Sequence, residues 1–225
     1  RKDYERLFDW ATSLGADLSK VCHGKDEYSG SGLFVRPDVE SIRDGEVVLT
    51  LPRALRIGKD RVIYGSGGIP RIYGLSQDTP SLSSLALLLL ALLSSSERKN
   101  TSNIDKDIDG FALYATLLPS LSQVRNAVAM NQVEAQAWSR KYGQKYGAAI
   151  ERERKRAECS IQYIRDVLFA RDIVDESALR WAIGMVMSRS HAFGSATERY
   201  LTPILDLANH RAEGNHETSS PWKKG

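Results

Sequence analysis

The sequence is poor in cysteine, and its two cysteines, Cys22 and Cys159, lie far apart without a CxxC pair. Two such thiols provide neither a disulfide framework nor a cysteine-rich zinc cluster, and His23 beside Cys22 adds too few ligands for a metal. The N-terminus also lacks the pattern of a secretory signal. We therefore expect an intracellular protein without a metal site, located in the cytoplasm, the nucleus or both.

Long apolar runs are also lacking. The most hydrophobic stretch is a nine-residue run over residues 85–93. A helix needs about 20 apolar residues to cross a bilayer, so we expect this run to form a buried helix and we expect no membrane partner.

A strong charge of one sign is absent as well, since the formal net charge is +3. The densest basic cluster, residues 151–156, alternates with acidic residues and predicts a solvated helix face. Nucleic-acid binding needs basic side chains gathered on one face, so no nucleic-acid partner is expected. The apolar share of 42% and the charged share of 26% are those of an ordinary folded domain.

The hydrophobic pattern predicts an amphipathic helix at the N-terminus, followed by two short strands. Apolar residues at helical spacing precede Gly15, which can end a helix in a left-handed conformation. Residues 33–35 and 46–51 are apolar and β-branched, as in strands, and Asp44-Gly45 marks a turn between them. Pro52 ends the second strand.

Glycine and proline residues break any regular period from Arg61 to Pro80, which predicts a linker. Residues 81–180 then have a helical pattern almost throughout, with Ser83 or Ser84 as a cap for the leucine-rich helix. A last helix is expected over residues 176–190, with Asp175 or Ser177 near its start. The expected fold class is α+β. We expect the chain to consist of three parts, residues 1–80, 81–180 and 181–225.

The segment 201–210 is the most informative part of the sequence, because an apolar run there contains Asp206, Asn209 and His210. A buried polar side chain without a partner costs roughly 1–3 kcal/mol, so three of them in five residues indicate a site. A purely structural interpretation stays open, because Asn-His can also close a turn or helix.

Two further features can bind a ligand. Gly30-Ser31-Gly32-Leu33 allows the backbone to approach a ligand closely, although a glycine pair of this kind also occurs in ordinary turns. Arg189 can pair with a carboxylate, or can simply be a cation near the end of a helix.

These motifs together, in this order, resemble the SET-domain protein lysine methyltransferases of the Rubisco large-subunit methyltransferase type. The matching parts are the glycine turn at 30–33, the segment 45–52 ending in proline, the helical stretch 81–180, Arg189, and residues 203–210. The resemblance implies a β-rich SET domain of small twisted sheets with a large inserted helical region.

The resemblance also implies a function, the transfer of a methyl group from S-adenosyl-L-methionine to a lysine of a non-histone protein, such as a ribosomal or other cytosolic protein. The low cysteine content favours this non-histone subclass, because many histone-directed relatives carry cysteine-rich zinc clusters. The residues implied to bind the cofactor are Ser29, Gly30, Ser31, Gly32, Arg189, Asn209 and His210. Those implied on the substrate side are Arg189 and Asp206.

One family feature is absent from the sequence. The resembled enzymes carry a tyrosine well beyond the Asn-His pair that orients the lysine nitrogen, and residues 211–225 contain no tyrosine. We therefore assign no catalytic residue and expect this chain alone to be inactive, as the first half of such an enzyme. A non-catalytic interaction protein is the alternative. The sequence leaves open the substrate protein, the degree of methylation, a lysine or histidine acceptor, and the oligomeric state.

Overall fold

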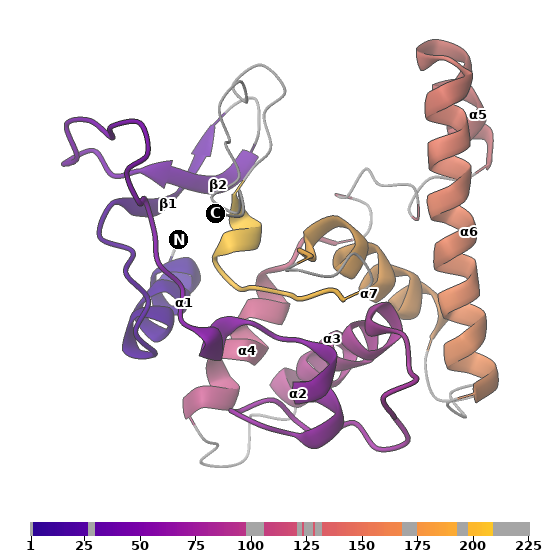
Figure 1. Cartoon of the computed structure of the whole chain (residues 1–225), viewed down its shortest axis with the longest axis horizontal. Helices are drawn as coiled ribbons and strands as arrows, with labels where there is room; N and C mark the ends of the chain where they lie inside the picture. Colours follow the sequence, from indigo (N-terminus) through magenta and orange to yellow (C-terminus); the bar gives the residue numbers. More distant parts are fainter. Residues whose placement is uncertain are drawn as a thin grey trace, which may run out of the picture.

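The computed structural model describes residues 2–26, 30–97, 106–120, 123, 128, 132–167, 175–192 and 198–208. Helices in these ranges surround a central apolar helix, with one small antiparallel sheet at one end (Figure 1). The elements are α1 (Lys2–Ser13), β1 (Val21–Asp26), β2 (Gly30–Val35), η1 (Arg53–Leu55), α2 (Lys59–Tyr64), α3 (Ser81–Glu97), α4 (Lys106–Leu117), α5 (Gln132–Tyr142), α6 (Gln144–Val167), α7 (Glu176–Arg189) and η4 (Leu205–Leu207). This agrees with the predicted α+β class.

Helix α3 is the centre of the core. It packs against α2, α4, α6 and α7, because a helix that is apolar on all sides is stable only when it is surrounded. Leu85, Leu88, Leu89 and Leu92 are fully buried, which confirms the predicted buried helix. The helix begins at Ser81 and not at Ser83 or Ser84, so that cap prediction was wrong. The Ser84 hydroxyl instead donates back to the Pro80 carbonyl at 3.3 Å.

Helix α1 matches the prediction from its apolar spacing. Leu7 and Ala11 are buried, and Trp10 meets the Phe111 ring of α4 edge-on, with 4.7 Å between the ring centroids. Gly15 follows the helix with a φ of 97°, a left-handed conformation that costs glycine little. The chain can therefore turn sharply into β1.

The strand predictions were only partly correct. Residues 33–35 lie in β2, but β2 pairs with β1, where Val21 faces Val35 and Gly24 faces Gly32. The sequence did not predict a strand at β1, and the strand predicted over 46–51 is reduced to a single bridge between Thr50 and Asp17. In that segment, hydrogen bonds from a side chain take the place of the backbone hydrogen bonds of a strand.

Lys20 provides those bonds. Its Nζ donates to the Glu46 carboxylate at 2.6 Å and to the Val47 carbonyl at 2.9 Å. The segment is therefore held beside the sheet without joining it. Within the described ranges the β content is limited to β1, β2 and three isolated bridges, which is less than the predicted β-rich domain.

The predicted linker at 61–80 is a packed part of the fold. Helix α2 extends into it, Val62 and Ile69 are buried, and Arg61 donates to the carbonyls of Ala54 and Gly67. The glycines and prolines therefore form turns on a fixed path. Within the described ranges, no helix combines the length and apolar character needed to cross a bilayer. The domain limits at 80 and 180 stay predictions.

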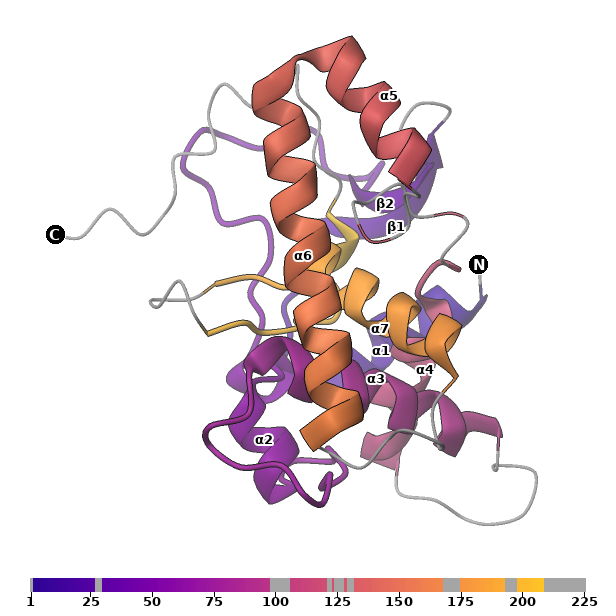
Figure 2. The same ribbon diagram turned by 90° about the vertical axis from the view of Figure 1, so that its right-hand side faces the viewer.

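Helices α5 and α6 form a hairpin that extends beyond the core, with the lower half of α6 packed against α3 and α7 (Figure 2). The charged face predicted for 151–156 is largely exposed and carries an Arg154–Glu151 pair at 3.6 Å.

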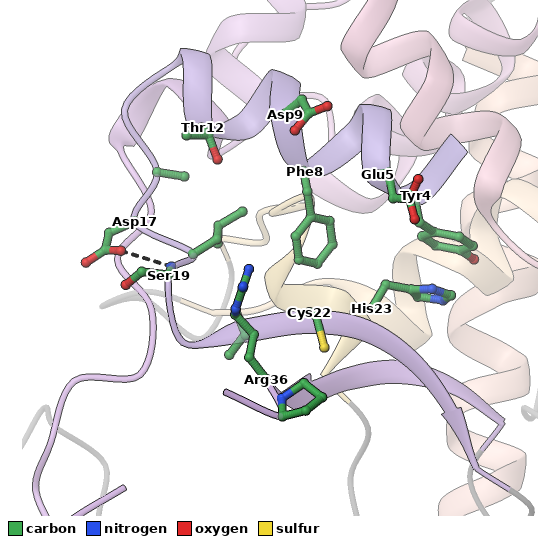
Figure 3. A pocket seen from close by; sticks show the side chains of 14 residues that line it. Tyr4, Glu5, Phe8, Asp9, Thr12, Asp17, Ser19, Cys22, His23 and Arg36 are labelled. Carbon is green, nitrogen blue, oxygen red and sulfur yellow. Dashed lines mark hydrogen bonds between the residues drawn. The ribbon is translucent and has the colours of Figure 1, made fainter. Parts of the chain in front are cut away.

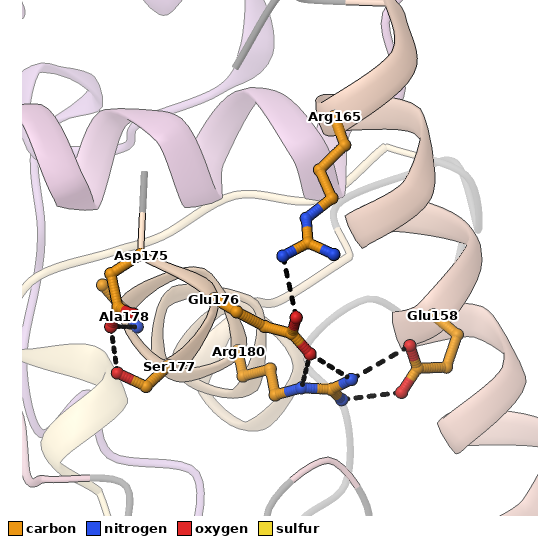
Figure 4. A network of polar contacts seen from close by, with 7 residues as sticks. All are labelled: Glu158, Arg165, Asp175, Glu176, Ser177, Ala178 and Arg180. Atoms are coloured by element: carbon orange, nitrogen blue, oxygen red, sulfur yellow. Dashed lines mark hydrogen bonds and ion pairs between the residues drawn. The ribbon is translucent and has the colours of Figure 1, made fainter. Parts of the chain in front are cut away.

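Ion pairs connect α6 to the start of α7 (Figure 4). Arg180 pairs with Glu158 at 2.6 Å, and Arg165 pairs with Glu176 at 2.7 Å. Asp175 caps α7 by accepting from the Ala178 amide at 3.1 Å, as predicted for the start of this helix. The far end of α7, which carries Arg189, is therefore fixed relative to the core.

Candidate functional site

The start of β2, the last turn of α7 and the η4 turn converge at one place in the fold (Figure 1). Arg189 is half-buried at the end of α7, and its Nη1 donates to the Asp206 carbonyl at 2.8 Å. Two residues predicted for the site from separate motifs therefore touch.

A strained segment brings Asp206 into this place. Leu201 exchanges two backbone hydrogen bonds with Ile57, at 2.8 and 3.0 Å, which anchors the segment to the core. Ile204 then has a φ of 78° and a ψ of −55°, although it is β-branched and fully buried. This conformation is rare for such a residue and is typical of functional sites, where the surroundings enforce it.

Asp206 is the most perturbed acid in the site. Its side chain is buried, Oδ2 accepts a hydrogen bond from the Tyr114 hydroxyl, and Oδ1 has no partner in the described part of the chain. Burial raises the pKa of this carboxyl to about 7, while the Tyr114 hydrogen bond and the Arg189 charge act to lower it. Perturbation of this kind, with a named charge partner, is typical of functional sites.

Tyr114 belongs to α4 and is fully buried. Burial raises its pKa well above the usual value, and the neighbouring Asp206 carboxyl raises it further. The phenol therefore stays protonated at any ordinary pH and acts as a permanent donor to Asp206.

Tyr4 joins the group from α1. Its hydroxyl donates to the Leu117 carbonyl at 3.4 Å, and its ring stacks on His23 with 3.6 Å between centroids. Burial raises the Tyr4 pKa, whereas the Arg189 charge and a hydrogen bond with Ser31 lower it. Tyr4 is therefore hydrogen-bonded to Ser31 in the glycine segment 30–32 and lies within range of the Arg189 charge. We call the group Tyr4, Ser31, Tyr114, Arg189 and Asp206 the Asp206 cluster.

The glycine segment 30–32 was predicted as a turn, but it forms the start of strand β2, and it lies beside this cluster. Gly30, Ser31 and Gly32 open β2, which contacts η4, and Gly32 is buried opposite Gly24 in the sheet register. The structure therefore brings together Gly30, Ser31, Gly32, Arg189 and Asp206 among the predicted site residues. The other predicted residues, Ser29, Asn209 and His210, lie outside the described residues.

A cavity of about 760 Å³ opens between α1 and β1 on the other side of Tyr4 and His23 (Figure 3). Its lining includes the carboxylates of Asp9 and Asp17 and the guanidinium of Arg36, but none of Gly30–Gly32, Arg189 or Asp206. The cavity therefore adjoins the Asp206 cluster without containing it. The cluster is the better candidate, because the buried, perturbed and convergent groups lie there.

No group of three or more histidine, cysteine, aspartate or glutamate side chains gathers into a metal-binding arrangement within the described ranges. The cluster itself offers one guanidinium, one carboxyl with a pKa of about 7, two phenols and the Ser31 hydroxyl.

Two members of the cluster were missed by the sequence analysis. Tyr4 was interpreted as an apolar position of an amphipathic helix, and Tyr114 fell within a helical stretch without a site motif. Tyr114 meets Asp206 across 92 positions of the chain, and no local pattern signals such a contact.

The sequence matches no family model and no curated protein. The fold is similar to a structure of Rubisco LSMT bound to AdoMet, with a TM-score of 0.64 and 19% identity over 96% of this chain and 46% of that chain. It is also similar to the SET domain of LSMT bound to lysine and AdoHcy, with a TM-score of 0.62 and 17% identity over 94% of this chain and 44% of that chain. This chain therefore spans less than half the length of the proteins that it matches.

Proposed function

We propose that this chain, which has the fold of the SET-domain methyltransferases as its motifs predicted, binds S-adenosyl-L-methionine and takes part in methylation of a protein lysine. The proposal depends mainly on one observation, the convergence of the glycine segment 30–32, Arg189 and Asp206. Similar folds have been solved with AdoMet, AdoHcy and lysine bound.

The residues of the cluster fit such a ligand. Asp206 keeps a buried acceptor, Oδ1, without a partner among the described residues, and a buried acceptor is stable only when a donor satisfies it. Arg189 uses Nη1 for the Asp206 carbonyl, and the planar guanidinium has further donors for a carboxylate. The cofactor's carboxylate matches Arg189 in charge, and the acceptor amine matches the Asp206 carboxyl on the substrate side.

When bound, S-adenosyl-L-methionine supplies a methyl group on a sulfonium centre, which needs little further activation. The protein must align the acceptor nitrogen with that methyl group and keep water out. It must also receive a lysine that has lost its proton, although the reference pKa of lysine is about 10.4. The buried surroundings of Asp206 favour the neutral amine, because burial disfavours a charged form.

The glycine segment at the start of β2 allows the backbone to lie close to the cofactor. Gly30 and Gly32 carry no side chain, so main-chain groups of β2 can reach a bound molecule. Ser29, Asn209 and His210 complete the proposed cofactor site. A non-histone substrate, such as a ribosomal or other cytosolic protein, and a location in the cytoplasm or nucleus are parts of the same proposal.

Calorimetric titration with AdoHcy tests the proposal. We expect Arg189→Ala to weaken binding by about 1–3 kcal/mol, because a charge-assisted hydrogen bond is lost. Arg71→Ala is the matched control, since Arg71 is an exposed arginine that contacts Tyr73 away from the cluster.

A second assay measures transfer of radiolabelled methyl groups to proteins of a cell lysate by the full-length protein, because the 225-residue chain alone is expected to be inactive. Incorporation that is resistant to base but lost in Arg189→Ala supports the proposal. Absence of both AdoHcy binding and methyl transfer in the unmodified protein would contradict it.

A further inference from the structure

Helix α4 is fixed against the candidate site by hydrogen bonds from two other segments. Tyr4 of α1 donates to the Leu117 carbonyl at the end of α4, and Trp181 of α7 donates from Nε1 to the Pro119 carbonyl at 2.8 Å. The carboxyl end of α4 therefore sits between the helix that precedes the sheet and the helix that carries Arg189.

The first half of α4 is held just as closely. Trp10 lies so near Gly110 that a Cβ there would approach the indole to 2.0 Å, and Arg61 lies over the Phe111 ring at 5.5 Å. These contacts leave α4 little freedom to turn about its axis. The direction of the Tyr114 side chain is thus determined by the packing.

The Tyr114 hydroxyl meets only one carboxyl oxygen of Asp206. It donates to Oδ2, and Oδ1 is left as the buried acceptor without a partner among the described residues. A carboxyl group held at one oxygen cannot rotate freely, so the direction of the other oxygen is defined as well.

We propose that Tyr114 is a positioning residue of the methyl-transfer site, and that through it helix α4 orients the Asp206 carboxyl toward the acceptor amine. The inference rests on the proposed function, which it deepens by adding a residue from the helical region that follows the first part of the fold. Tyr114 acts through Asp206 and needs no contact with the cofactor.

Among the described residues, the charged and titratable groups around Asp206 come from three helices. They are Tyr114 on α4, Arg189 on α7 and Tyr4 on α1. Of these, Tyr114 and Arg189 act to lower the pKa of Asp206, against the effect of burial. Loss of the Tyr114 hydroxyl therefore raises the pKa of Asp206 above its present value of about 7.

The test compares Tyr114→Phe with Asp206→Asn and with the double variant. Tyr163→Phe is the matched control, because Tyr163 lies on α6 and its hydroxyl makes no hydrogen bond within the described residues. The first measurement follows the carbon signal of the Asp206 carboxyl by NMR as a function of pH, in protein without ligand. The second measures the initial rate of methyl transfer to lysate proteins from pH 6 to pH 9, with each substitution made in the full-length protein.

We expect Tyr114→Phe to move the Asp206 titration to higher pH and to lower the transfer rate most at neutral pH. For a rise of about one pKa unit, the rate relative to Tyr163→Phe would fall about fivefold at pH 7 and recover by pH 9. In the Asp206→Asn background, Tyr114→Phe should have no further effect on the rate, because residues that act through one contact are not additive.

An unchanged Asp206 titration in folded Tyr114→Phe would overturn the inference. So would a loss of rate that is equal at every pH, or one that is additive with Asp206→Asn, since either result means a structural role alone. If Tyr114→Phe does not fold, Asp206→Asn provides the test. Any step near pH 7 in the dependence of the methyl-transfer rate on pH must be absent in that variant. Failure of the proposed function differs from all of these, since the unmodified protein would then neither bind AdoHcy nor transfer methyl groups.

Discussion

At the scale of single residues, the electrostatics of the site centre on Asp206. The pKa of this carboxyl is about 7 in the folded protein, against a usual value of 3.8. Between these two values the folded state binds a proton that the unfolded state has released. The free energy of unfolding therefore falls as the pH rises through this window, and the effect is complete above pH 7.

Asp206→Asn should remove this dependence. The variant should gain stability relative to the unmodified protein between pH 5 and pH 8, by about 2–3 kcal/mol, because each pKa unit corresponds to about 1.4 kcal/mol. Urea denaturation at both pH values measures the difference. Asp44→Asn is the control, since Asp44 is exposed in a loop, and an equal change in both variants would mean that Asp206 does not titrate as described.

The residue scale also shows what the sequence can predict of the site. Asp206 was predicted because it lies in an apolar run with two other polar residues, and Arg189 because the family resemblance implied it; the structure brings them into contact. Tyr4 and Tyr114 could not be predicted as site residues. Each occupies an apolar position of a helix, and the sequence does not show what the hydroxyl at the tip of the side chain will contact. Their roles depend on which distant segment packs opposite them.

At the scale of elements, the predictions succeeded where a local signal determines the structure. The apolar spacing of α1, the uniform apolar character of α3 and the Asp175 cap of α7 each depend on neighbouring residues alone. The strand at 46–51 failed because a strand needs a partner, and β2 pairs with β1. The apolar pattern gave no signal for β1, the strand that takes the place of 46–51 beside β2.

The end of α1 provides a test at this scale. Gly15 has a φ of 97° and open space where a Cβ would lie, so Gly15→Ala should destabilise the protein by about 1 kcal/mol through backbone conformation alone. Gly15→Asn should cost less, because asparagine tolerates the left-handed region better. Urea denaturation measures both, and equal stability of Gly15→Ala and the unmodified protein would contradict the assignment.

At the scale of the whole molecule, α3 joins the parts that form the site. It packs against α4, which carries Tyr114, and against α7, which carries Arg189. The helical region from residue 81 onward therefore supports the cluster through direct packing. A substitution in the centre of α3 should destabilise both.

Leu88→Ala tests this connection. Leu88 is fully buried, whereas Leu87 on the same helix is only half-buried. We expect Leu88→Ala to lower the free energy of unfolding by about 2–5 kcal/mol, and Leu87→Ala to lower it less, because only the first leaves a cavity in the core. Denaturation followed by both circular dichroism and tryptophan fluorescence measures the loss, and an equal loss in both variants would contradict the central position of α3.

We propose that the Asp206 cluster and the glycine segment 30–32 together bind S-adenosyl-L-methionine. Hydrogen exchange followed by mass spectrometry, with and without AdoHcy, tests it most directly. We expect ligand-dependent protection at residues 30–35, around Arg189 and at 204–208, with little change along α5. Unchanged exchange throughout, or protection confined to the cavity between α1 and β1, would contradict it.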